Sequence, residues 1–309
     1  MNAPHAHDCP AADRLVDDAI RAIGAEIDAL AIPRLLGVVL GGGYARGEGG
    51  VILRASRASQ VPSPKSQNPV PDGQPATCDL RPATPAEPAL SNDLDFYVVA
   101  EDAASSADLA AIAAALRPVS EKWTARLGVD VDFSPPKTPW RIRHDEERLM
   151  IQELVHGYCD VAGRPGAELF RDVARRDPSA LPAMEAVRLL VNRGAGLLLA
   201  AESGASPDFV ARNINKAILG CGDARLIARG GYRWRAEERA EALGDPLYAA
   251  AVAWKFRPRP EPVCVWETAR DSWLAAAAGG ISTARRRGRG RRRGRRRAPP
   301  RASGSRPAR

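Results

Sequence analysis

The chain has 309 residues, of which 45% are hydrophobic and 27% charged, a composition typical of a soluble globular protein with one large or two ordinary domains. Its net charge of +8 comes from residues 285–309, which hold 13 of the 45 basic residues and no acidic one. The remainder of the chain has 37 acidic residues against 32 basic ones, and this negative balance argues against a surface that binds duplex nucleic acid. Five widely spaced cysteines without a CxxC pair disfavour a disulfide framework or a zinc site, and the short apolar runs and absent signal pattern predict a cytoplasmic protein with no membrane partner.

The first part of the chain alternates between helical and strand patterns. Apolar residues recur at helical spacing over residues 11–30, and residues 105–126 are typical of one or two helices. Three short runs of β-forming residues are expected to be strands: Leu35–Leu40, Leu94–Val99 and Val129–Phe133. We therefore expect a mixed α/β domain over residues 1–143, built on a small mixed sheet.

Two segments are expected not to fold. Residues 54–92 are rich in proline and serine and have strand patterns on both sides, so we interpret them as a flexible insertion inside the first domain. Residues 283–309 combine arginine with glycine, proline and serine, and we expect a disordered basic tail there.

After residue 143 the strand patterns cease. The remaining apolar periodicity is helical and predicts an all-α domain over residues 144–282. Its expected helices are residues 145–156, 182–202, 207–229 and 236–255.

A glycine-rich stretch follows the first expected strand. Residues 40–50 read LGGGYARGEGG, with six glycines in eleven residues. Glycines cluster where another group approaches the backbone closely or where φ is positive, and at a strand end the approaching group is commonly a phosphate. A tight turn without a ligand is the simpler alternative.

Two pairs of aspartates fall on the expected strands. Asp93 and Asp95 flank a core leucine, and Asp130 and Asp132 flank a core valine, so each pair is expected on one face of its strand. Carboxylates this close repel each other unless a cation lies between them, and hard oxygen ligands suit Mg²⁺. A single Asp-x-Asp more often binds no metal, so the argument depends on the glycine turn and both pairs occurring together.

In this combination, the stretches LGGGYARGEGG, NDLDFYVV and VDVDF resemble the nucleotidyltransferase domain of the DNA polymerase beta superfamily. The resemblance covers residues 35–133 and is greatest to the small bacterial members that include the aminoglycoside nucleotidyltransferases. It implies that Gly42 and Gly43 bind phosphates and that Asp93 and Asp95 bind metal.

The later acid of the family pattern matches Asp130, with Asp132 as the reserve candidate for the third metal ligand. Two departures accompany the match. Gly43 stands where many members have serine, and the insertion lengthens the spacer between Gly43 and Asp93 beyond the family's usual length. A long loop is tolerable because its closure cost grows only slowly with length.

The resemblance also implies a reaction. A nucleoside monophosphate would move from an NTP, with ATP the expected donor, to a hydroxyl of an unknown acceptor, with two Mg²⁺ ions and release of pyrophosphate. The active site would lie in the cleft between the two domains. Arg46 would pair with the triphosphate or merely support the turn, and Lys216 would reach the nucleotide from the helical domain or simply be solvated.

The alternative is a protein that is not an enzyme. In it the same fold serves as a binding or regulatory module, and the arginine-rich tail contacts nucleic acid or another acidic partner. The aligned carboxylates separate the two hypotheses, because a binding module does not need them.

Overall fold

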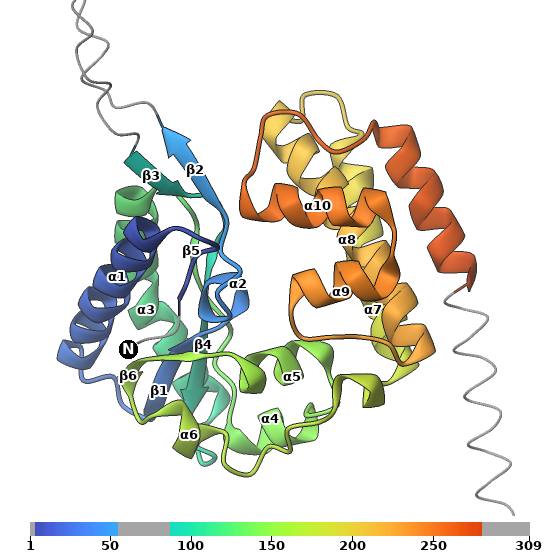
Figure 1. Ribbon diagram of the computed structural model, residues 1–309. Coiled ribbons are helices and arrows are strands. Elements are labelled where there is room, and N and C mark those ends of the chain that lie inside the picture. The colour runs from blue at the N-terminus through green and yellow to red at the C-terminus, as the bar shows by residue number, and fades with distance from the viewer. Residues whose placement is uncertain (1–3, 55–86, 280–309) are drawn as a thin grey trace, which may run out of the picture.

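The computed structural model describes residues 4–54 and 87–279. Its first part is a mixed sheet with helices on both faces, and its second part is a group of helices that faces one end of the sheet (Figure 1). Within these residues no helix combines the length and apolar character needed to cross a membrane.

A four-stranded sheet with the order β5–β4–β1–β6 forms the centre of the first part. β1 (Leu35–Leu40) pairs antiparallel with β4 (Leu94–Ala100) on one side and with β6 (Cys159–Gly163) on the other. β4 pairs parallel with β5 (Val131–Phe133). The expected small mixed sheet is therefore confirmed with strands at all three expected places, although the third begins at Val131 rather than Val129 and leaves Asp130 just before it.

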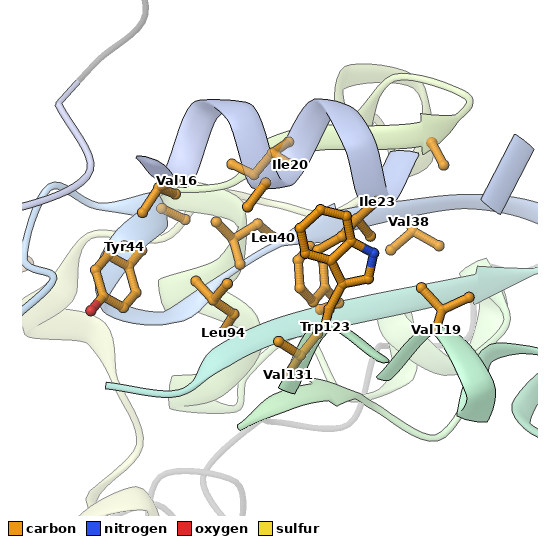
Figure 2. Packing of buried hydrophobic residues seen from close by; sticks show 14 of the residues in the cluster. Val16, Ile20, Ile23, Val38, Leu40, Tyr44, Leu94, Val119, Trp123 and Val131 are labelled. Atoms are coloured by element: carbon orange, nitrogen blue, oxygen red, sulfur yellow. The ribbon is translucent and has the colours of Figure 1, made fainter. Parts of the chain in front are cut away.

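Two long helices cover one face of this sheet. α1 (Pro10–Ala29) and α3 (Ser106–Leu127) pack their apolar sides against Val38 and Leu40 of β1, and Trp123 closes the layer from α3 (Figure 2). Burial of this apolar surface is the main force that holds both helices to the sheet.

The opposite face is covered by shorter helices. α4 (Pro139–His144), α5 (Leu149–His156) and α6 (Gly166–Leu169) pack there around Val39 and Val99. Neighbouring residues of β1 thus enter different cores, as the two-residue period of a strand requires.

α3 is one continuous helix. The Ser105 side chain accepts from the Asp108 backbone N–H while the Asp108 carboxylate binds the Ser105 N–H, which is a capping box. Gly128 ends the helix in the left-handed region, with φ +71°.

A second, two-stranded sheet borders the segment expected to be a flexible insertion. β2 (Val51–Arg54) pairs antiparallel with β3 (Glu87–Leu90). The expectation for residues 54–92 is therefore wrong at its C-terminal end, because residues 87–90 form a strand. Its remainder, residues 55–86, and the expected tail, residues 283–309, lie outside the described residues.

The second part of the structure is helical. Its elements are a 3₁₀ turn, η2 (Pro178–Ala180), the helices α7 (Ala183–Ala200), α8 (Pro207–Arg229), α9 (Ala236–Leu243) and α10 (Pro246–Phe256), and a last helix over residues 266–279. α7 and α8 share a core in which Leu190 packs with Cys221 and Ala224.

Three expectations for this region need correction. Strands do not cease after residue 143, because β6 completes the main sheet from residues that the apolar pattern placed in a helical domain. The helix expected over residues 145–156 begins only at Leu149. The helix expected over residues 236–255 is two helices, because Gly244 ends the first with φ +62° and the Asp245 side chain caps the second.

Candidate functional site

The glycine turn lies directly against the acidic strand β4. The Gly41 N–H donates to the Asp95 carbonyl at 2.8 Å, and α2 (Gly42–Ala45) begins at the next residue. Gly42 has φ +68°, and a Cβ there would lie 2.6 Å from Asp95 Oδ2. Only glycine fits a position that combines this backbone conformation with this neighbour.

At the end of the glycine stretch, the groups that approach the backbone closely belong to the protein itself rather than to a ligand. A Cβ on Gly49 would lie 2.0 Å from the Tyr44 ring, and the Gly49 N–H donates to the His5 carbonyl at 3.0 Å. The Tyr44 hydroxyl donates to the Gly50 carbonyl at 2.7 Å. The later glycines thus allow the N-terminal segment and a buried tyrosine to pack against the loop.

His5 is the residue that fixes this N-terminal segment. It is 3% exposed, with Nδ1 3.0 Å from the Tyr44 carbonyl and Nε2 3.0 Å from Asp17 Oδ1. Burial alone would lower its pKa, but the Cys159 sulfur, the Asp17 carboxylate and the Tyr44 carbonyl together raise it to about 9. A protonated His5 therefore stabilises the glycine turn through its contact with the Tyr44 carbonyl.

The aspartates predicted as metal ligands gather on β4 and β5. Asp95 and Asp132 are register partners on these parallel strands, and the Leu94 N–H donates to the Asp130 carbonyl at 2.8 Å. Asp93 lies just before β4. Leu94 and the following phenylalanine are fully buried, as the alternation of the strand predicts.

These carboxylates influence one another's ionisation. The pKa of Asp95 is raised, because surrounding protein displaces water from it and because Asp93 and Asp132 carry like charge. The pKa of Asp132 is raised by the same kind of desolvation and then by Asp130 and Asp93. Asp132, rather than Asp130, is therefore the acid beside Asp95, whereas Asp130 lies with Asp93 in the wall of the adjoining cleft.

The aspartate oxygens are ligands that suit a hard cation, although the side chains do not converge on one position. Within residues 4–54 and 87–279, no three His, Cys, Asp or Glu side chains are close enough together to hold a metal ion. The pKa values of Asp95 and Asp132 are raised first by burial and then by the like charges around them, and a bound cation would oppose both effects. The carboxylate oxygens are thus of the kind that Mg²⁺ prefers, but as they lie among the described residues they do not form a closed metal site.

A cleft of about 620 Å³ adjoins the acids and separates the sheet from the second part of the structure. One wall carries Asp93 and Asp130, and the facing wall comes from α7, α8 and α10. Lys216 of α8 is exposed and lines this facing wall. Its ammonium is close enough to lower the pKa of Asp95, which opposes the like charges there.

Arg46 also lines the cleft, but it is engaged with the protein's own acids. Its side chain is 13% exposed and lies 3.7 Å from Glu48 and 3.8 Å from Glu153. Burial would lower its pKa, and Glu153 and Glu48 outweigh that effect and raise it. The guanidinium Nε is buried without a partner among the described residues.

Glu48 is a central residue of the site, although its place in the sequence looks like that of an ordinary polar loop residue. It is 3% exposed, and its Oε1 accepts from the Ala236 N–H at the start of α9 at 2.8 Å. Its Oε2 pairs with Lys255 of α10 at 2.5 Å. Burial would raise the pKa of Glu48, but Lys255, Arg239 and Arg46 lower it to about 2. The glycine turn is thereby bound to both helices.

A second group of buried charges continues this network into the helices. Asp223 of α8 pairs with Arg239 of α9 at 3.0 Å and accepts from the Tyr248 hydroxyl at 2.6 Å. The Tyr232 hydroxyl donates to Glu153 at 2.8 Å. The sequence indicated this network only as charged residues within expected helices, because the spacing of residues along a helix does not show which charges are buried.

The chain matches no family model, and no solved structure matches it.

Proposed function

We propose that the protein is a Mg²⁺-dependent nucleotidyltransferase of the DNA polymerase beta type. It would transfer a nucleoside monophosphate from an NTP, with ATP the expected donor, to a hydroxyl of an acceptor and release pyrophosphate. The observation that carries the proposal is the contact between the Gly42 turn and Asp95 within a group of mutually repelling carboxylates beside a cleft.

Asp93, Asp95 and Asp132 are the residues that would hold magnesium, and their side chains would have to draw together around the ion, because as they stand in the described part of the chain they do not form a three-ligand site. When bound, such ions supply positive charge that activates an acceptor oxygen and stabilises the departing phosphates. Asp130 lines the cleft and would accept the proton of the acceptor hydroxyl. Lys216 faces the carboxylates from α8 and would bind the negative charge of the nucleotide.

Arg46 and Glu48 have a different task in this proposal. Both are held in ion pairs, so Arg46 keeps the turn in place rather than serving as a free triphosphate ligand. The volume of the cleft lies within the range of small-molecule sites, and nucleotide and acceptor would approach each other inside it.

The non-catalytic alternative depends on residues 283–309, which lie outside the described part of the chain. Among the described residues, the grouped carboxylates favour chemistry over simple binding. The enzyme is therefore the function to be tested.

The test is calorimetric titration of ATP with Mg²⁺ into the full chain at physiological salt. Wild type is expected to bind, and Asp95→Asn and Asp132→Asn are each expected to bind at least about tenfold more weakly. Asp18→Asn removes one exposed charge of α1 and serves as the matched control. Equal binding by Asp95→Asn and wild type would refute the proposed site. If the variants instead bind more weakly, wild type is screened for pyrophosphate release that depends on an added acceptor.

A further inference from the structure

Arg193 of α7 is held in a fixed position at the helical wall of the cleft. Its aliphatic stem packs against α8 at Gly220, where a Cβ would lie 2.5 Å from Arg193 Cγ. The same residue pair lines the cleft. Gly220 thus leaves the space that lets the arginine cross α8 and reach the cleft.

The guanidinium of Arg193 differs from the other inner cations of the cleft. Arg46, Arg239 and Lys255 each form an ion pair with a buried acid. For Arg193, by contrast, the described residues supply neither a hydrogen bond nor an ion pair, and only the charges of Asp223 and Glu153 act on it from a distance. A partly desolvated cation without a counter-charge is unfavourable, so this position lacks an anion.

The acids nearest to Arg193 are already engaged elsewhere. Asp223 is bound by Arg239 and by a tyrosine hydroxyl, and Glu153 by Tyr232 and Arg46. Burial lowers the pKa of Arg193, and Asp223 and Glu153 only partly oppose this. No acid among the described residues therefore occupies the donors of this partly exposed guanidinium.

The surroundings indicate what kind of anion fits. Lys216 lies one turn before Gly220 on α8, lines the same wall and is close enough to act on Asp95. Lys216 and Arg193 thus line the same wall of the cleft. Lys216 is close enough to act on Asp95, and Arg193 lies beside Asp223 and Glu153. An extended anion with several charges can neutralise two cations of one wall, which a single carboxylate cannot, and a guanidinium binds phosphate oxygens in pairs.

We infer that Arg193 binds the terminal phosphates of the nucleotide and the pyrophosphate that remains after transfer. The inference rests on the proposed function for the identity of the nucleotide, but the phosphate site itself does not depend on catalysis. A phosphate on the acceptor is the other source of the same chemistry.

The experiment measures binding of ATP, AMP and inorganic pyrophosphate to the full chain by calorimetry at physiological salt. Arg193→Met keeps the stem that packs on Gly220 and removes the charge, whereas Arg193→Lys keeps a charge. Arg14→Met, at an exposed position of α1, removes the same charge elsewhere. Residues 285–309 contribute the same background to every variant, so differences between variants report on the cleft.

We expect Arg193→Met to bind ATP and pyrophosphate at least about tenfold more weakly, with less than about a twofold change for AMP. Arg193→Lys should be intermediate and Arg14→Met unchanged, with thermal unfolding as the check on folding. Equal affinities of Arg193→Met and wild type would overturn the inference while leaving the nucleotidyltransferase proposal intact.

The remaining outcomes are equally decisive. Weaker pyrophosphate binding without weaker ATP binding would assign the site to a phosphate of another ligand and overturn its assignment to the nucleotide. Equal weakening for AMP would also overturn the assignment to the terminal phosphates. Arg193-dependent pyrophosphate binding by a protein that binds no ATP would overturn the assignment to the nucleotide and refute the proposed function, and would leave Arg193 as a pyrophosphate site alone.

Discussion

Replacing Glu48 by glutamine removes the charge that binds the glycine turn to α9 and α10. The substitution keeps the size of the side chain and an oxygen that can accept from the Ala236 N–H. What disappears is the charge facing Lys255, Arg239 and Arg46. A buried charge cluster that loses one partner leaves the others uncompensated, so we expect Glu48→Gln to destabilise the fold.

The magnitude follows from the ionisation of Glu48. Its pKa is about 2 in the folded protein against an ordinary value of 4.5, and the residue is 3% exposed. This difference corresponds to roughly 3 kcal/mol of stability at pH 7. Because the folded-state pKa is the lower one, that stability is complete above about pH 4.5 and is lost as the pH falls through about 2.

The assay is urea unfolding of wild type and Glu48→Gln at several pH values from 7 down to 3. The gap between their unfolding free energies should be roughly 3 kcal/mol at pH 7 and about 1 kcal/mol at pH 3. Glu121→Gln, at an exposed position of α3, is the control and should match wild type. A gap below about 1 kcal/mol at pH 7, or one that does not narrow toward pH 3, would refute the reasoning.

Two further predictions concern residues that pack against the glycine turn. Gly49→Ala places a methyl group against the buried Tyr44 ring and should lower the free energy of unfolding by about 1–3 kcal/mol. The control is Gly231→Ala, whose added methyl group would have its nearest neighbour 3.6 Å away and should change the free energy of unfolding little. His5→Gln should destabilise most below the ordinary histidine pKa of 6.5, because the raised folded-state pKa of about 9 contributes stability there that is lost as the pH rises through 9. Urea unfolding at pH 6 and pH 9 checks this, and a gap that widens toward pH 9 would contradict it.

The sheet was predictable where short strands carried their own apolar signal. Leu35–Leu40 and Leu94–Val99 contain runs of valine, leucine and phenylalanine, and the structure has strands there. β6 (Cys159–Gly163) was missed because its five residues include an aspartate and a glycine, and only Ala162 among the five is buried. Its identity as a strand depends on pairing with β1, which is a long-range interaction that no local pattern contains.

The candidate site was predictable in its residue types more than in its partners. Aspartates at alternate positions indicated a shared face, but only the parallel register of β4 and β5 shows that Asp132 lies opposite Asp95. The glycine stretch indicated close approach without revealing that Tyr44 and the N-terminal segment supply much of it. Glu48 looked like a polar loop residue, and its burial arises from helices nearly 200 positions later in the chain.

The position of β6 in the sheet has a consequence for how the chain is synthesised. β1 is made early, but its second neighbour is complete only when residue 163 has been added. At typical synthesis rates that leaves one edge of β1 without its partner for on the order of ten seconds. An open strand edge can pair with another chain, so a fragment that stops at residue 143 would keep that edge permanently. Expression of the sheet as an isolated piece should therefore extend through β6 and the α6 helix that follows it.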